Sequence, residues 1–189
     1  TYIEREELLN KMHAKNYRKI ERPYTRSEFI HGAPQPRLAK YDYGKCREDY
    51  EYELSLIAET DCQIRDVALE SARVSAGKTL TAELGENFYL VVKVHPHHVL
   101  RENKMIFGAH ADRLQEGMSR AFGRPIGRAA QVEAGTKVIT VRVFKNGITA
   151  AREALKIAAK KLPKNYRIEI TPLKKEIVSS AETTEVSTS

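Results

Sequence analysis

Residues 136–163 read TKVITVRVFKNGITAAREALKIAAKKLP and contain a strand, a turn and a helix in succession. The segment 139–143 alternates apolar with polar residues, which is the pattern of a strand with one buried face. Asn146-Gly147 then turns the chain. Thr149 can cap a helix over 150–162, which the final proline ends. This order predicts a half-buried strand followed by a helix of about 150–162.

The predicted helix has one apolar side and one basic side. Its apolar residues recur at three- and four-residue spacing, as in a helix that faces a core: Ile148, Ala151, Leu155, Ala158 or Ala159, and Leu162. The other side carries Arg152, Lys156, Lys160, Lys161 and Lys164. With Arg167 included and Glu153 as the only acid, residues 146–167 have a charge balance of +5. This face is a candidate basic patch.

Two further strands are predicted at 50–58, YEYELSLIA, and at 88–94, FYLVVKV. In the first, apolar residues fall on one face at period two and acids fall on the other, which we expect to be solvated. The surrounding segment 48–70 holds eight acids and one base, a balance of −7. We therefore expect this segment to face away from any nucleic acid.

A helix is predicted to follow from residue 60. Thr60 can cap it, and Gln63 three residues later completes a capping box. The apolar stripe that follows has helical spacing and consists of Ile64, Val67, Ala68, Ala72, Ala76 and Leu80. A last strand, YRIEI, is predicted at 166–170.

Strands and helices interleave irregularly, and the strands alternate in polarity. This favours an α+β fold with a mostly antiparallel sheet, two packed helices and a long Gly/Arg-rich loop. We expect an N-terminal extension at 1–16, a single domain at 17–170 and a disordered Ser/Thr/Glu-rich tail at 171–189.

The predicted loop is RENKMIFGAHADRLQEGMSRAFGRPIGR at 101–128, which lacks clear strand or helix periodicity. Spans of this length are usually functional or disordered. Glycine allows close backbone approach, and arginine matches phosphate oxygens. Two interpretations remain open: a loop that reaches into a polyanion, and a mobile surface loop with scattered charge.

Residues 17–47 carry eight bases against three acids, a balance of +5, with five aromatic residues among them. Pro23, Pro34 and Pro36 exclude a long helix. An extended segment that mixes bases with aromatics can follow a phosphate backbone while its rings stack on bases. The alternative, which is compatible with the first, is an arm whose aromatic residues cover the core.

The whole chain has a net charge of +7 and a pI near 9.4, which favours an anionic partner. No apolar run approaches the ~18–20 residues that cross a bilayer, so we expect no membrane-spanning segment. The charge alone leaves nucleic acid, a membrane surface and an acidic protein open as partners, and the cysteines favour a cytoplasmic location. Cys46 and Cys62 lack the spacing of a zinc site or a disulfide framework, and we expect free thiols.

The segment HPHH at 95–98, with His110 and Asp112 nearby, contains metal-ligand residue types. Pro96 forces an extended backbone that sends neighbouring side chains apart, and no known metal-site spacing accompanies them. We therefore expect no metal. No nucleotide-binding loop or nucleophile motif is present either, so we expect no cofactor, and a nucleic-acid-binding protein is favoured over an enzyme.

Four stretches carry a more specific signal: YRKIERPYTRSEFIHGAPQPRL at 17–38, KVHPHHVLRENKM at 93–105, RENKMIFGAHADRLQEGMSRAFGRPIGRAAQV at 101–132, and REALKIAAKKLP at 152–163. In this order they closely resemble the large-subunit ribosomal protein family called L-ten-e in archaea and eukaryotes and L-sixteen in bacteria. The archaeal form is the most similar, and the resemblance covers about Tyr17 to Arg167.

The resemblance implies a structural protein of cytoplasmic large ribosomal subunits, without catalytic residues and with no membrane partner. It would bind 23S rRNA near 5S rRNA and the peptidyl transferase centre, contact neighbouring ribosomal proteins, help to position the acceptor arm of tRNA at the A site, and join late in subunit assembly. The implied rRNA-binding residues are Arg18, Lys19, Arg22, Tyr24, Arg26, Arg37, Arg101, Lys104, Arg124, Arg128, Lys160 and Lys161. The implied tRNA-proximal loop comprises Ala111, Asp112, Arg113, Leu114, Gln115, Gly117, Met118, Arg120, Phe122 and Gly123.

The chain departs from the family pattern at several points. Residues 1–16 are neutral where the family has a short Arg/Pro-rich tail, His110 replaces a usual glycine, and Ser119 replaces a usual base. Two other classes remain as alternatives: an RNA-modifying or metal-dependent enzyme that uses the histidines, and an RNA-binding regulator that acts away from the ribosome.

Overall fold

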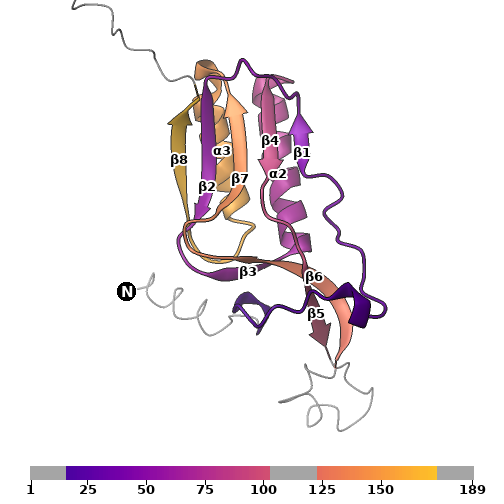
Figure 1. Ribbon diagram of the computed structural model, residues 1–189. Helices are drawn as coiled ribbons and strands as arrows, with labels where there is room; N and C mark the ends of the chain where they lie inside the picture. The colour runs from indigo at the N-terminus through magenta and orange to yellow at the C-terminus, as the bar shows by residue number, and fades with distance from the viewer. Residues whose placement is uncertain (1–15, 103–122, 174–189) are drawn as a thin grey trace, which may run out of the picture.

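The computed structural model describes residues 16–102 and 123–173, which fold into helices and antiparallel sheets as expected for the α+β class. Figure 1 shows helices on one face of a large sheet, with a smaller sheet below it. The helices and strands are β1 (Asp42–Gly44), β2 (Tyr52–Ala58), β3 (Cys62–Arg65), α2 (Asp66–Leu84), β4 (Phe88–Val92), β5 (His98–Glu102), β6 (Arg124–Val132), β7 (Lys137–Val143), α3 (Ile148–Ala159) and β8 (Tyr166–Pro172), and the short 3-10 helices are η1 (Asn16–Arg18), η2 (Ser27–Phe29) and η5 (Lys145–Gly147).

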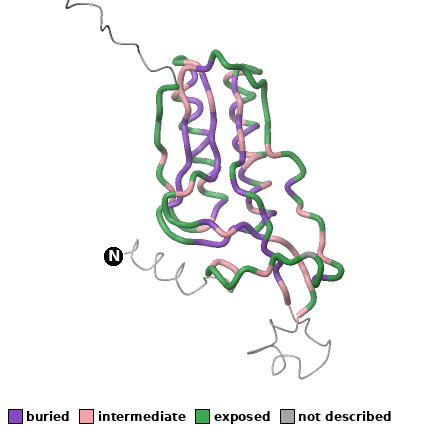
Figure 2. The backbone as a smooth tube through the Cα atoms, viewed as in Figure 1, coloured by how far each residue is buried: buried purple, intermediate pink, exposed green. Residues whose placement is uncertain are grey.

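The large sheet has five antiparallel strands in the order β1-β4-β7-β2-β8, and α2 and α3 pack on one of its faces. Phe88, Leu90 and Val92 of β4 are buried while the residues between them are half-buried, as the alternating sequence predicts. Figure 2 shows that the buried residues concentrate between the sheet and the helices. The strands predicted at 88–94, 136–144 and 166–170 are confirmed with small shifts at their ends, and β8 runs on to Pro172.

The predicted helix start at Thr60 is wrong. Residues 62–65 form strand β3, which pairs with β6, and α2 begins only at Asp66. Consequently Ile64 is buried in a strand, whereas Val67 lies on the solvent side of the helix and is 42% exposed. Local capping signals at 60–63 are outweighed by the hydrogen bonds of a strand pair whose partner lies far along the chain.

The second predicted helix is confirmed as α3, but its start differs. The helix begins at Ile148 after the 3-10 turn η5, with Gly147 at the N-cap and no side-chain capping bond, so Thr149 lies inside the helix. The apolar stripe is as expected at Ala151, Leu155 and Ala158, all of which are fully buried.

Strand β2 is more buried than the predicted half-exposed strand, since every residue from Leu54 to Ala58 is buried. Its position between β7 and β8 explains this, because both neighbouring strands flank it with long side chains. Lys137 and Arg167, for example, stand directly opposite Ile57 on the two sides.

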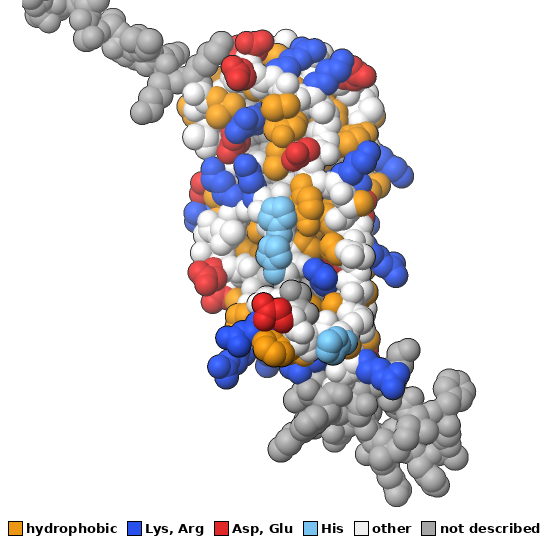
Figure 3. Space-filling model, turned by 45° about the vertical axis from the view of Figure 1, so that its right-hand side comes forward, with side chains coloured by type: hydrophobic (Ala, Val, Ile, Leu, Met, Phe, Trp, Pro, Cys, Tyr) orange, Lys and Arg blue, Asp and Glu red, His pale blue; other side chains and the backbone are white. Residues whose placement is uncertain are grey.

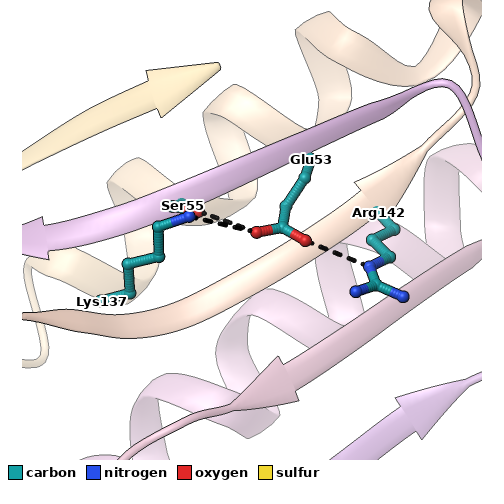
Figure 4. Close-up of polar contacts among 4 residues, drawn as sticks. All are labelled: Glu53, Ser55, Lys137 and Arg142. Carbon is teal, nitrogen blue, oxygen red and sulfur yellow. Dashed lines mark hydrogen bonds and ion pairs between the residues drawn. The ribbon is translucent and has the colours of Figure 1, made fainter. Parts of the chain in front are cut away.

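The acids of β2 are also not simply solvated. Glu53 accepts a hydrogen bond from Arg142 Nε at 3.1 Å and from Lys137 Nζ at 3.3 Å (Figure 4). Burial would raise the pKa of the Glu53 carboxyl, but the hydrogen bonds and charges of Arg142 and Lys137 outweigh this and lower it. The carboxylate therefore binds β2 to β7 on the sheet face that lacks helices.

The small sheet corrects the prediction of a single loop over 101–128. It has the order β3-β6-β5, and the two ends of the supposed loop lie in β5 and β6, where Glu102 stands opposite Arg124. Pairing of β5 with β6 stabilises strands that have little sequence periodicity of their own. Residues 103–122, with most of the Gly/Arg-rich segment, lie outside the described residues. So do nearly all of the expected N-terminal extension, of which only Asn16 is described, and nearly all of the expected tail.

Cys46 is exposed and Cys62 is buried, and both are free thiols as expected. None of the helices in residues 16–102 and 123–173 combines the length and the apolarity that crossing a bilayer requires.

Candidate nucleic-acid interface

The stretch 17–40, here called the arm, runs along the small sheet and then up beside β1 (Figure 1). Its first part is held by Gln63 of β3 and Gln131 of β6, which are direct cross-strand partners. Gln63 Nε2 donates to the Tyr17 carbonyl at 3.0 Å, and Gln131 Nε2 donates to the Glu21 carbonyl at 2.8 Å. The sheet thus binds the backbone of the arm, and the neighbouring side chain of Lys19 remains exposed.

Tyr24 attaches the arm to the free edge of β5. Its N–H donates to His98 Nδ1, and its carbonyl accepts from the N–H of Val99, both at 3.0 Å. His98 is buried, and burial lowers the pKa of its imidazole, with Glu21 acting against this shift and Arg101 reinforcing it. The neutral ring is the form that can accept the bond from Tyr24.

The last part of the arm is fixed at two further points. Arg128 Nε of β6 donates to the Pro34 carbonyl at 2.9 Å. The N–H of Arg37 donates to Asp66 Oδ2 at 2.9 Å, and Asp66 Oδ1 accepts from the N–H of Val67 at 2.8 Å. Asp66 is only 4% exposed. This carboxylate therefore connects the arm to the first turn of α2.

This arrangement exposes most of the basic side chains predicted to bind rRNA. Lys19, Arg22, Arg26 and Arg37 are exposed, and Arg18 is half-buried. In Figure 3, Lys and Arg side chains flank the lower end of the described part, which is the end with the small sheet. A fixed backbone with exposed cations suits a phosphate backbone, since little conformational entropy is lost on binding.

The structure brings together predicted residues that are far apart in the sequence. Arg18 from η1 and Lys160 and Lys161 from the end of α3 line one pocket of about 240 Å³. Arg65, the single base of the acidic 48–70 segment, lines the same pocket. The two basic patches of the sequence are therefore continuous in space, and the acidic segment contributes a cation to them.

Arg101 and Arg124 lie at the ends of β5 and β6 from which residues 103–122 extend. The guanidinium carbon of Arg101 is 4.0 Å from the centroid of the Tyr24 ring, a cation–π contact. Arg128 has a structural task as well, because its Nε binds the arm. Arg101 and Arg124 thus lie at the base of the 103–122 segment, where Glu102 is the cross-strand partner of Arg124.

Part of the predicted site lies outside the described residues. This holds for Lys104 and for all of the tRNA-proximal loop except Gly123, namely Ala111, Asp112, Arg113, Leu114, Gln115, Gly117, Met118, Arg120 and Phe122. Gly123 directly precedes β6.

The histidines of the HPHH segment have different environments. The rings of His95 and His97 stack with centroids 5.8 Å apart, and His95 also lies 4.3 Å from the ring of Tyr41. His98 instead points to the arm. Over residues 16–102 and 123–173, no three His, Cys, Asp or Glu side chains form a group that could hold a metal ion. His110 and Asp112 lie outside these ranges.

Sequence reasoning missed Gln63, Arg65, Gln131, His98 and Asp66. Gln63 was assigned to a helix cap, which hid its role as a cross-strand partner of Gln131. The net negative charge of segment 48–70 predicts that the segment faces away from nucleic acid. That prediction overlooks the buried carboxylate of Asp66 and the basic side chain of Arg65. A period-two reading of CQIR at 62–65 with Cys62 and Ile64 on one face would have suggested a strand.

The chain matches the family described as Ribosomal protein L16p/L10e over residues 13–169. The protein named Large ribosomal subunit protein uL16 from Staphylothermus marinus is 52% identical over 153 residues, which cover 80% of this chain and 88% of the relative. The protein of the same name from Sulfolobus acidocaldarius is 53% identical over 164 residues, with 85% and 93% covered. That of Hyperthermus butylicus is 49% identical over 160 residues, with 84% and 89% covered.

Proposed function

Because this chain belongs to the ribosomal protein L16p/L10e family, we propose that it binds 23S rRNA in the large ribosomal subunit, near 5S rRNA and the peptidyl transferase centre. Like its relatives, it is a structural constituent of the large ribosomal subunit in the cytoplasm and not an enzyme. The relatives named above support the expected similarity to the archaeal form of the family.

The observation that carries the rRNA proposal is the fixed arm. Its backbone carbonyls and N–H groups are bound by Gln63, Gln131 and His98, while Lys19, Arg22 and Arg26 are exposed. A cation held in place by its backbone can neutralise a phosphate and release a counterion without first ordering a flexible segment. The arm therefore supplies a row of preorganised phosphate contacts.

The proposed tRNA role concerns residues 111–123. β5 and β6 pair side by side up to Glu102 and Arg124, and the chain between these two residues contains this region. Arg101 and Arg124 lie at that end of the small sheet. We place the two basic ends against rRNA and the nearly neutral middle, ADRLQEGM, toward the acceptor arm of tRNA at the A site. Late entry into the subunit, and contacts with neighbouring ribosomal proteins, belong to the same proposal.

The first experiment asks whether the protein acts on the ribosome. The native protein should co-sediment with large subunits after a high-salt wash, whereas an RNA-binding regulator that acts elsewhere would be released. Release into the top fractions, with the subunits intact, would contradict the proposal.

The second experiment tests the arm itself. Arg22→Ala with Arg26→Ala should weaken binding to a 23S rRNA transcript and make the plot of log K against log salt shallower by about 1.4–1.8, for two lost contacts. Lys78→Ala with Lys145→Ala is the matched control, since both lysines are exposed and lie away from the arm. Equal slopes in the two double variants would remove the arm from the interface.

A further inference from the structure

We propose that the pocket between η1 and the end of α3 is a binding site for one unstacked nucleotide of single-stranded RNA. This inference rests on the proposed function, because it names a site within the rRNA interface. The pocket has a volume of about 240 Å³. That is below the range of about 300–1,000 Å³ for pockets that enclose a whole small molecule, and it suits a single base with its phosphate outside.

The rim of this pocket is cationic. Arg18, Arg65, Lys160 and Lys161 come from three separate parts of the chain, and no acid is among the described residues that line it. Arg65, Lys160 and Lys161 are exposed. Their charged groups are therefore accessible to a phosphate from solvent. Such convergence from distant segments is the arrangement expected for one bound phosphate group or two adjacent ones.

The inner wall is apolar and aromatic. Leu162 is buried, Ala68 and Pro163 are half-buried, and the half-buried Tyr17 lines the same pocket. A nucleobase needs a flat apolar surface of this kind, and stacking on an aromatic ring tolerates any of the four bases. The cations at the rim and the apolar wall together match the two halves of a nucleotide.

The backbone of Tyr17 is attached to the small sheet beside the pocket. Its carbonyl accepts from Gln63 Nε2 at 3.0 Å, and the guanidinium carbon of Arg65 lies 5.9 Å from the centroid of its ring. The Gln63 side chain is 1% exposed and is itself fixed by Gln131. The backbone of Tyr17 is therefore fixed at the pocket, with Arg65 beside its ring.

The backbone at this site argues for side-chain recognition of the phosphate. The pocket adjoins the carboxyl end of α3, where the helix dipole repels an anion. The N–H groups of Lys160 and Lys161 are already donated to the carbonyls of Lys156 and Ala158. The charged side chains of lysine and arginine must therefore bind the phosphate. Removal of these side chains should reduce the slope of log K against log salt.

The test uses the full chain and a 23S rRNA transcript that contains traces of 4-thiouridine. Tyr17→Leu should weaken binding by about 5- to 150-fold, the range for one lost base stack, and Tyr17→Phe should bind within about twofold of the unchanged protein. Arg65→Ala should reduce the salt slope by about 0.7, and Lys160→Ala with Lys161→Ala by about 1.4. Arg65 makes no capping bond to α2, so its loss should not unfold the helix.

Ultraviolet crosslinking then locates the nucleotide. The peptide that contains Tyr17 should carry a crosslink that is lost in Tyr17→Leu, and Lys78→Ala should leave affinity, slope and crosslink unchanged. If Tyr17→Leu and the Lys160, Lys161 double variant bind the transcript as tightly as the unchanged protein, with the same slope, the pocket is not an RNA site although the proposed function stands. If the unchanged protein neither binds the transcript nor co-sediments with large subunits, the proposed function itself fails.

Discussion

Replacement of Asp66 by alanine should lower the free energy of unfolding by about 3 kcal/mol. The Asp66 carboxylate accepts hydrogen bonds from the N–H groups of Arg37, at 2.9 Å, and Val67, at 2.8 Å, and it is only 4% exposed. A hydrogen bond to a charged group contributes about 1.5–3 kcal/mol, and an anion in the first turn of a helix adds about 0.3–1 kcal/mol. The cost of burying the carboxylate offsets part of this sum.

Asp66→Asn removes the negative charge while it nearly keeps the size and shape of the side chain. The asparagine amide has a single oxygen, so it can keep one of the two N–H bonds, and its NH₂ group would face the other N–H. We therefore expect the asparagine variant to lose at least half as much stability as the alanine variant. In the alanine variant the Arg37 amide should exchange its hydrogen faster, because the arm is no longer tied to α2.

Urea denaturation followed by circular dichroism gives the free energy of unfolding, and hydrogen exchange gives the protection of the Arg37 amide. Asp61→Ala is a matched control, since Asp61 is exposed and binds one backbone N–H, that of Ala134, at 2.8 Å. It should cost about 1 kcal/mol or less. A loss below about 1 kcal/mol for Asp66→Ala, or an asparagine variant as stable as the unchanged protein, would refute this account of the arm's attachment.

Three further predictions concern the edge of the small sheet, the tRNA-proximal loop and the large sheet. Burial lowers the pKa of His98. Below the ordinary histidine pKa of about 6.5, the unfolded chain therefore binds more protons than the folded protein. Thermal stability should be full at pH 7.5 and should fall as the pH drops to 5, and the fall should be smaller in His98→Asn. Deletion of residues 111–122 should still allow incorporation into large subunits, measured by sedimentation, but impair tRNA placement in an A-site binding assay, whereas complete loss of rRNA binding would make the loop an anchor. Gly44→Ala should lower the free energy of unfolding, measured by thermal denaturation, by at least about 2 kcal/mol. The reason is that Gly44 has φ +97° and its added Cβ would meet the Phe88 carbonyl oxygen. Gly135→Ala should lower it less, because Gly135 has φ +88° but no atom near its added Cβ.

The strands with regular alternation were predictable because their pattern reports a local fact, one buried face. β4 and β7 carry Leu90 and Val141 at such positions, and both residues are buried in the shared core. Helix α3 was predictable for the same reason, since its apolar stripe repeats at helical spacing. In these elements the local preference of the sequence agrees with its tertiary surroundings.

The small sheet was not predictable from local patterns. β3 has four residues, and its stability comes from β6, in which Gln131 pairs with Gln63 across a long stretch of sequence. The capping-box pattern at Thr60 is locally valid, but the strand pair outweighs it. Likewise, β5 and the start of β6 show no alternation of buried apolar and exposed polar residues. The arm covers one edge of this sheet, and a polar residue such as His98 is buried beneath it.

The candidate site shows the same division. Composition alone indicated that the basic residues of the arm and of α3 serve an anionic partner, and their exposure agrees with that interpretation. The pocket shared by Arg18, Arg65 and Lys161 required the three-dimensional structure, because the sequence places these residues in segments of opposite net charge. The net charge of segment 48–70 therefore does not predict where a single side chain such as Arg65, at the end of β3, lies in the structure.

The bond between Tyr24 and Val99 has a consequence for the protein before it meets RNA. β5 is an edge strand of the small sheet, and unpaired edges of this kind recruit strands from other chains and lead to aggregation. The arm occupies that edge with a carbonyl of its own chain, at 3.0 Å from the Val99 nitrogen. Before the protein binds RNA, the arm thus shields this edge, and truncation of the arm should increase self-association of the protein.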